Sequence, residues 1–292
     1  MNRIARCLVS GAMLLCVGVG LAVAQENAEG TTPPPKVLAI FREFLKPGKA
    51  GSPHEKAESA FVQAEERAKW PEHYLALTSV TGKQRALFFY GYDSFDAWEK
   101  DNAAMEKNPT LSAALDRASI ADGELLSEID SAVLVYNEGE SMRGPVDIAH
   151  MRYMEISVYR LRPGHRSDWE DLVKLVQSGY DKISDVHWAM YEAMYGQEGT
   201  EFVVIIPMKS AAEIDQGFAN DKQFAQALGE DGMKKLQDLE AASIEFSQHN
   251  LFEISPKMSY PRDEWVKADP EFWKPKPAAM PKKTEEKPAA KQ

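Results

Sequence analysis

Histidines beside aromatic residues are the side chains in this sequence best suited to acid–base chemistry or ligand contact. Two short segments at positions 70–74 (WPEHY) and 187–191 (HWAMY) each combine them at the expected start of a strand. Because imidazole titrates near neutral pH, such a histidine could bind or protonate a small molecule. The alternative is that these amphipathic residues cap the ends of the fold with their polar tips in water. The ligand-binding candidates from these segments are His73, Tyr74, His187, Trp188 and Tyr191.

Metal ligation has no support in the spacing of the histidines. The sequence contains neither H-x-x-x-H nor H-E-x-x-H, and no histidine has a cysteine partner, so the usual zinc patterns are missing. Acidic residues on the first helix are interpreted as solvated surface. They are Glu55, Glu58, Glu65 and Glu66. We therefore predict no metal site.

Nucleophilic catalysis and nucleotide binding are also unsupported. No G-x-S-x-G motif, G-x-G-x-x-G motif or P-loop is present, and these motifs carry the nucleophile or cradle the phosphates in the common folds. The sequence thus offers no motif for a nucleotide cofactor.

The first 24 residues have the features of a secretory signal peptide. Arg3 and Arg6 precede an apolar stretch over 8–23, and Ala22-Val23-Ala24 is a small-x-small cleavage site. The apolar stretch is short for a membrane anchor and is interrupted by glycines and a serine. We predict cleavage near Ala24, export to the periplasm or beyond the cell, and no stable membrane insertion.

Composition limits the partners of the mature chain. Without Arg3 and Arg6, 32 basic residues face 45 acidic ones, a net charge of −13. Both cysteines leave with the signal peptide, so the core must stabilise the fold without disulfides. The acidic balance argues against nucleic acid and anionic membrane surfaces. It is compatible with a small-molecule ligand and with a homo-oligomer.

The body of the chain contains an internal repeat with an offset of 116 residues. VLAIFREFLKPG at 37–48 aligns with YMEISVYRLRPG at 153–164, and the turn LKPG reappears as LRPG. Repeats of this length indicate duplicated domains. We predict a first unit over 37–141 and a second over 150–256. A flexible leader at 25–36 has no core to join, an aromatic arm spans 257–273, and 274–292 is a disordered tail.

Each unit is predicted to follow the order β-α-β-β-α-β of the ferredoxin-like fold. The first helices are expected at 52–69 and 167–183, with Ser52 and Ser167 as N-caps. Hairpins are expected at 74–92 and 189–208. The second helical regions, 94–126 and 210–243, are each expected to be broken once.

Two such units in tandem, each opening with a strand, a Pro-Gly turn and a helix, resemble the dimeric α/β-barrel superfamily. The resemblance covers about residues 36–256. Members of the superfamily include NIPSNAP-like proteins and antibiotic-biosynthesis-type monooxygenases. It implies an α+β fold in which two four-stranded sheets of one chain pair as a barrel, with helices outside. Burial of apolar surface leads to the same expectation, because a sheet covered by helices on one face needs a partner on the other.

Alternation in the first strand of each unit predicts which side chains line the space between the sheets. The steadily apolar set is expected to face the helices: Leu38, Ile40, Met154, Ile156 and Val158. The opposite set is expected to face the other sheet: Ala39, Phe41, Glu43, Glu155, Ser157 and Tyr159. The ligand-binding candidates from this set are Phe41, Glu43, Glu155 and Tyr159. The alternative is an ordinary core between the sheets with polar groups near its rim.

Haem is the one cofactor that the resemblance raises, through chlorite dismutase-like members that use a proximal histidine and a distal arginine in the second unit. His249 or His187 with Arg160 or Arg162 would fill those roles, but the residues around them give no match. We predict no cofactor and keep haem as the alternative.

Aromatic residues follow the second unit and are costly to leave in water. They are Trp265, Phe272 and Trp273. We predict that this arm clamps onto the barrel; the alternative is a partner-binding arm.

Three functions fit these observations. The first is binding of a small, partly apolar molecule between the sheets, as in a NIPSNAP-like module of unknown ligand. The second, which the resemblance allows, is a cofactor-independent monooxygenase or isomerase that uses Tyr159, His187 and Trp188. The third is a non-catalytic structural or interaction module with a filled barrel.

Overall fold

The computed structural model describes residues 31–274. The predicted signal peptide, residues 25–30 of the leader and the tail beyond Lys274 lie outside the described residues. Eight strands and seven α-helices make up the described part of the chain. The strands are β1 (Val37–Leu45), β2 (Tyr74–Ser79), β3 (Arg85–Tyr92), β4 (Leu126–Tyr136), β5 (Tyr153–Leu161), β6 (Ala189–Tyr195), β7 (Glu201–Met208) and β8 (Ile244–Ile254). The helices are α1 (Ser52–Ala68), α2 (Phe95–Glu106), α3 (Pro109–Gly123), α4 (Arg166–Tyr180), α5 (Ala212–Ser243), α6 (Asp263–Ala268) and α7 (Pro270–Trp273).

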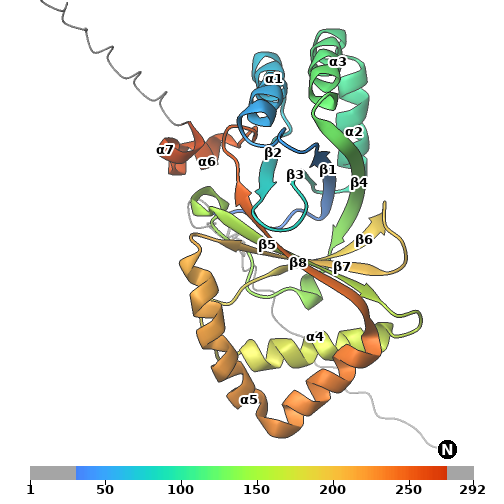
Figure 1. The fold of residues 1–292 in the computed structure, drawn as a ribbon, viewed down its shortest axis with the longest axis vertical. Coiled ribbons are helices and arrows are strands. Elements are labelled where there is room, and N and C mark those ends of the chain that lie inside the picture. Colours follow the sequence, from blue (N-terminus) through green and yellow to red (C-terminus); the bar gives the residue numbers. More distant parts are fainter. Residues whose placement is uncertain (1–30, 275–292) are drawn as a thin grey trace, which may run out of the picture.

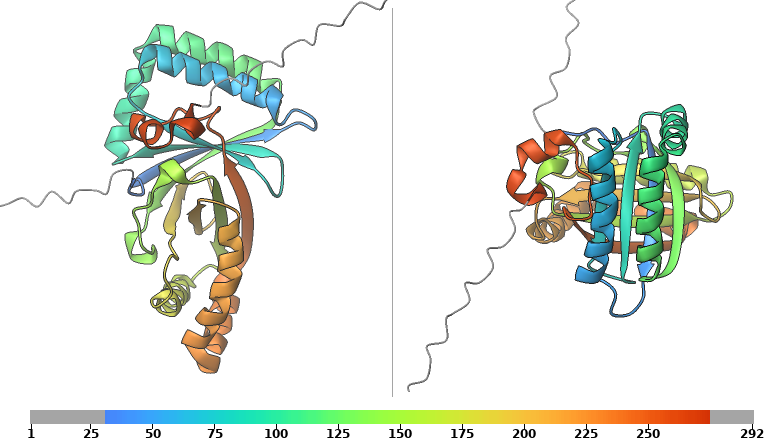
Figure 2. Two further views of the ribbon diagram at one scale, coloured as in Figure 1. Left: turned by 90° about the vertical axis from the view of Figure 1, so that its left-hand side faces the viewer. Right: turned by 90° about the horizontal axis from the view of Figure 1, so that it is seen from above.

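The strands form one closed antiparallel barrel in the order β1-β3-β2-β8-β5-β7-β6-β4. Two seams join the halves, where β2 pairs with β8 and β4 pairs with β6. Helices α1, α2 and α3 cover the outside of the first half, and α4 and α5 cover the second (Figure 1). Seen from above, α1 and α3 lie side by side over their sheet (Figure 2). The predicted α+β barrel formed within one chain is confirmed. Among residues 31–274, no helix is both long enough and apolar enough to cross a bilayer.

The turns and helix breaks follow from local sequence. Gly48 and Gly164 end the two Pro-Gly turns with φ of 77° and 86°, a conformation that glycine adopts without strain. The second helical regions are each broken once, as predicted: Asn108 caps α3 in the first half, and Gly229 interrupts α5 in the second. The predicted N-caps are wrong by one or two residues, because Gly51 and His165 occupy those positions.

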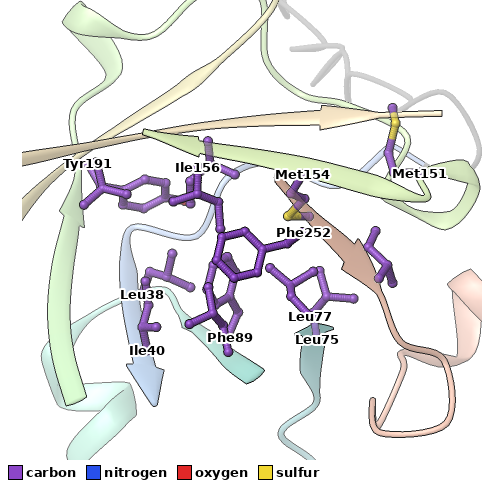
Figure 3. Close-up of a cluster of buried hydrophobic side chains, with 14 of the residues drawn as sticks. Leu38, Ile40, Leu75, Leu77, Phe89, Met151, Met154, Ile156, Tyr191 and Phe252 are labelled. Atoms are coloured by element: carbon purple, nitrogen blue, oxygen red, sulfur yellow. The ribbon is translucent and has the colours of Figure 1, made fainter. Parts of the chain in front are cut away.

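The two faces of the first strands are the reverse of the sequence prediction. Leu38 and Ile40 of β1 pack with Ile156 of β5 in a cluster between the sheets (Figure 3). Met154 belongs to the same cluster, and Val158 packs against it. The alternate residues Ala39, Phe41, Glu43, Glu155, Ser157 and Tyr159 therefore lie on the helix side. Alternation could not identify the faces, because helices bury one side of each sheet and the opposing sheet buries the other.

Both ends of the described chain close one end of the barrel. Thr32 pairs with Val146, so residues 31–36 lie against the fold, contrary to the predicted leader without a core to join. The predicted clamp is confirmed: Trp265 and Trp273 are buried in the cluster between the sheets. The indole Nε1 of Trp265 donates to Thr32 Oγ1 at 2.9 Å, and that of Trp273 donates to the Ala149 carbonyl at 3.0 Å.

Candidate functional site

A cavity of about 190 Å³ lies between the sheets at this closed end of the barrel. Leu38 of β1 and the neighbouring strands β2 and β3 supply one wall, while β5, β6 and β7 supply the other. The apolar lining comprises Leu38, Leu75, Phe89, Met154, Ala189, Tyr191, Ile205 and Trp265. Residues 32–35 close the mouth, where Pro35 packs so near to Gly91 that a Cβ there would meet it at 2.8 Å. A glycine at 91 is thus what lets the N-terminal segment approach.

Few polar groups reach this apolar cavity, and they lie at its mouth. Thr32, His73, Asp93 and Arg262 supply them. The His73 ring stacks on Tyr260 with ring centroids 4.4 Å apart. Its Nδ1 is buried and has no hydrogen-bond partner among residues 31–274. Burial lowers the pKa of His73, and the charge of Arg262 acts in the same direction. A pKa below the ordinary value for histidine favours the neutral ring at pH 7.

The structure brings two of the sequence candidates to the cavity and places the others elsewhere. His73 and Tyr191 line it. His187 lies behind the wall, where its Nε2 is 2.8 Å from the carbonyl oxygen of Pro207, a lining residue. The remaining candidates do not line it: Phe41, Glu43, Tyr74, Glu155, Tyr159 and Trp188. All six side chains lie on the helix-facing side of the sheets. The predicted place of Phe41, Glu43, Glu155 and Tyr159 between the sheets is therefore wrong.

Each displaced aromatic candidate has a structural partner. Tyr74 packs in the apolar cluster beneath the first-half helices. Trp188 donates from Nε1 to the Glu140 carbonyl at 2.8 Å. Tyr159 packs on Trp169 of α4, with ring centroids 5.3 Å apart. Tyr159, His187 and Trp188 therefore do not share a site facing the cavity, as the enzyme alternative required.

Sequence reasoning missed several cavity residues because they lie outside the repeated units. Pro33, Pro34 and Pro35 precede the first unit, while Arg262 and Trp265 follow the second. The one available indication was the aromatic arm, whose predicted clamping would place Trp265 on a barrel end.

A second group of chemically capable side chains lies on the helix side of β1. We call Glu43, His54, Glu58 and Asp122 the buried His–carboxylate cluster. Sequence spacing gave no dense cluster of this kind, and Glu58 was interpreted as solvated surface. In the structure Glu58 and Glu65 are each only 3% exposed. The missed indication is the spacing of four and seven residues among positions 54, 58 and 65, which puts them on one helix face.

Two of the residues that the resemblance raised for haem have protein partners in the structure. His249 Nδ1 is 2.8 Å from Ser157 Oγ, and its ring meets the edge of Tyr159. Tyr159 in turn packs on Trp169, which stacks on Phe202. Arg160 is bound to Glu201 through two hydrogen bonds.

Comparisons with known proteins find likeness in structure alone. No protein-family model matches the sequence, and no curated protein matches it. A candidate monooxygenase from Fusobacterium nucleatum aligns with 11% identity and a TM-score of 0.48, covering 76% of this chain and 93% of its own. An anthrone oxidase-like protein aligns with 15% identity and a TM-score of 0.47, covering 75% and 92%.

A chlorite dismutase variant from Candidatus Nitrospira defluvii aligns with 10% identity and a TM-score of 0.46, covering 82% of this chain and 98% of its own. Monooxygenases and chlorite dismutase-like proteins of this kind belong to the dimeric α/β-barrel superfamily. At these scores the alignments carry no inference about activity. The closed eight-stranded barrel itself is the observation that agrees with the expected architecture.

Proposed function

We propose that this protein binds a small, partly apolar molecule in the cavity at the closed end of its barrel. The observation that carries the proposal is a cavity whose lining is mainly apolar and includes the polar side chains of Thr32, His73, Asp93 and Arg262. Binding sites for small molecules combine apolar walls with a few polar groups of this kind. The apolar part of a ligand would fill the cavity while its polar group contacts these side chains.

The size of the cavity limits the ligand. A cavity of about 150 Å³ holds one benzene molecule, and this one has about 190 Å³. A single ring with a short substituent therefore fits. A hydroxyl can pair with either tautomer of His73, and Arg262 at the mouth favours a partial negative charge. Substituted phenols are thus the ligand class that the chemistry favours.

Native mass spectrometry of the isolated protein, followed by calorimetric titration with phenol and 4-ethylphenol, tests this proposal. We expect one molecule bound per chain. Ala189→Leu, which fills the cavity, should weaken binding at least tenfold. Ala193→Leu lies on the same strand and face but outside the lining, and it should bind as the wild type does. His73→Phe should weaken the binding of 4-ethylphenol more than the binding of ethylbenzene. Equal binding by Ala189→Leu and Ala193→Leu, or no binding by the wild type, would overturn the proposal.

We also propose that the chain is exported and that its halves are two tandem ferredoxin-like units, over 37–141 and 150–256. The order β4-β1-β3-β2 in the first half and β8-β5-β7-β6 in the second supports the tandem units, since it is the same order in both. Arg3, Arg6 and the small-x-small site support export. Sequencing of the secreted protein from its N-terminus should begin at Gln25; an intact Met1 would contradict export by cleavage.

A further inference from the structure

The buried His–carboxylate cluster draws its members from three elements on the helix side of the first-half sheet. Glu43 comes from β1, His54 and Glu58 come from consecutive turns of α1, and Asp122 comes from α3. Glu43 is 8% exposed and the other three are 2–3% exposed. One donor atom from each lies within 4.8 Å of all the others. The cluster lies on the opposite face of β1 from the cavity, so it is independent of the site proposed above.

The cluster cannot keep all of its carboxyl groups ionised without a further cation. Three carboxyl groups face one imidazole, and burial makes uncompensated charge very costly. Glu58 Oε1 and Asp122 Oδ1 are buried without a hydrogen-bond partner within residues 31–274. Both atoms are directed at the imidazole, lying 3.8 and 3.4 Å from His54 Nε2. The two oxygens therefore lie around one imidazole nitrogen without a hydrogen bond to it.

The spacing of the donor atoms suits coordination around a central ion. His54 Nε2 lies 3.0, 3.4 and 3.8 Å from oxygens of Glu43, Asp122 and Glu58, respectively. Ligands that bind zinc at about 2.1 Å in a tetrahedron are about 3.4 Å apart. The observed separations surround that value. The remaining separations among the four donor atoms are 4.8 Å or less.

We propose that Glu43, His54, Glu58 and Asp122 bind one divalent transition-metal ion of the manganese-to-zinc series. Carboxylate oxygens suit Mn²⁺ and imidazole suits Zn²⁺ and Fe²⁺, whereas Ca²⁺ and Mg²⁺ prefer sites built of oxygen alone. Four protein ligands from buried positions describe a closed, structural site. The ion fastens α1 and α3 to β1.

When no ion is bound, protons neutralise part of the negative charge of the buried His–carboxylate cluster. Burial, reinforced by the charges of Glu43 and Asp122, raises the pKa of Glu58 to about 10. Burial and the charge of Glu43 raise the pKa of Asp122 to about 6, which His54 opposes. The groups facing Glu58 are Glu43, His54, Glu65 and Asp122. Metal ligands must be deprotonated to bind an ion, so binding should tighten as pH rises.

Calorimetric titration of the whole chain with Zn²⁺ or Mn²⁺, after chelation and dialysis, tests the site. We expect one ion per chain, about one proton released at pH 7.5, and a higher melting temperature with the ion. Ca²⁺ and Mg²⁺ should bind at least tenfold more weakly. Glu58→Gln and Asp122→Asn should each weaken binding at least tenfold, since each removes a ligand charge.

Glu65→Gln is the matched control, because Glu65 is an equally buried carboxylate on the same helix and lies outside the cluster. Its affinity for the ion should equal that of the wild type. Glu58→Gln replaces a protonated acid by a neutral amide of the same shape, so it should fold without metal and show no melting shift with the ion. Absence of binding by the wild type would overturn the proposal and leave a proton-holding cluster. Binding that survives both ligand substitutions, or that Glu65→Gln weakens equally, would also overturn it.

Discussion

The layers between sheet and helices differ in the two halves of the molecule, although the same arrangement of strands supports both. In the 116-residue repeat, Glu43 of β1 corresponds to Tyr159 of β5, and Ala86 of β3 corresponds to Phe202 of β7. The first-half layer holds the buried His–carboxylate cluster. The second-half layer holds a stack in which Trp169 meets Phe202 with ring centroids 4.9 Å apart.

The comparison shows that the same strand arrangement accommodates two kinds of side-chain layer between sheet and helices. The stability of the two layers depends differently on pH. A ring stack stabilises the fold through buried apolar area and ring contacts, which do not vary with pH. A buried carboxylate group stabilises it only in the right protonation or ligation state. We therefore expect the second half to respond to loss of volume and the first half to respond to charge.

The largest expected effect is the loss of Trp169. Its side chain is almost completely buried, stacks on Phe202, and donates from Nε1 to Glu140 Oε2 at 3.1 Å. Trp169→Ala should lower the free energy of unfolding by about 3–5 kcal/mol, measured by urea denaturation. Trp98→Ala, at a half-buried position on α2, is the comparison variant. A smaller loss for Trp169→Ala than for Trp98→Ala would contradict the importance of the stack.

The next effect is a pH dependence carried by Glu65. Burial, with the charge of Asp101, raises its pKa to about 8, whereas a carboxyl of an unfolded chain titrates near about 4.3. Between these values the folded chain holds the extra proton, so the free energy of unfolding falls as pH rises. The slope from this one group is at most about 1.4 kcal/mol per pH unit.

Urea denaturation of the metal-free protein at intervals from pH 5 to pH 8 measures this slope. Glu65→Gln keeps the shape without the titrating group, so its stability should fall less steeply than that of the wild type. The two proteins should differ most at pH 8 and least at pH 5. Parallel curves would show that Glu65 does not hold a proton in the folded state.

The smallest effect concerns a polar contact of Ser157 in the second half, whose Oγ also donates to Glu155 Oε1 at 3.3 Å. Ser157 Oγ and His249 Nδ1 lie 2.8 Å apart on neighbouring strands. Ser157→Ala should cost about 1 kcal/mol of unfolding free energy, the usual worth of one hydrogen bond. Ser157→Thr keeps the hydroxyl and serves as the control, with thermal unfolding as the measurement. A loss above about 3 kcal/mol for Ser157→Ala would show that the second half also depends on a polar network.

Much of the fold could be predicted because its features are local. The hairpins around β2–β3 and β6–β7, the helix breaks at Asn108 and Gly229, and the clamping aromatic arm all follow from turn residues, caps and apolar spacing. The orientation of β1 and β5 could not be predicted. Strands buried on both faces have no polar side to mark the outside.

The candidate site was predicted only where the sequence marks a strand entrance. His73 and Tyr191 were found because each belongs to a segment that combines a histidine with aromatic residues. Arg262 and Trp265 were missed as site residues because the fold brings them to the cavity from beyond the repeat. His54, Glu58 and Asp122 were missed because charged residues on a helix are usually solvated, and only the tertiary structure shows that these are covered.

The closing seam of the barrel sets the order in which the molecule can be completed. Leu77 of β2 pairs with Ile254 of β8, and Thr32 is bonded to Trp265, 233 residues away in sequence. The β2 edge of the first-half sheet therefore stays unpaired during synthesis until almost the whole described chain has emerged. Contacts so distant in sequence make closure a late and slow step. A chain that stops before Ile244 would lack the strand that closes this seam and would expose the apolar lining that β8 and Trp265 cover.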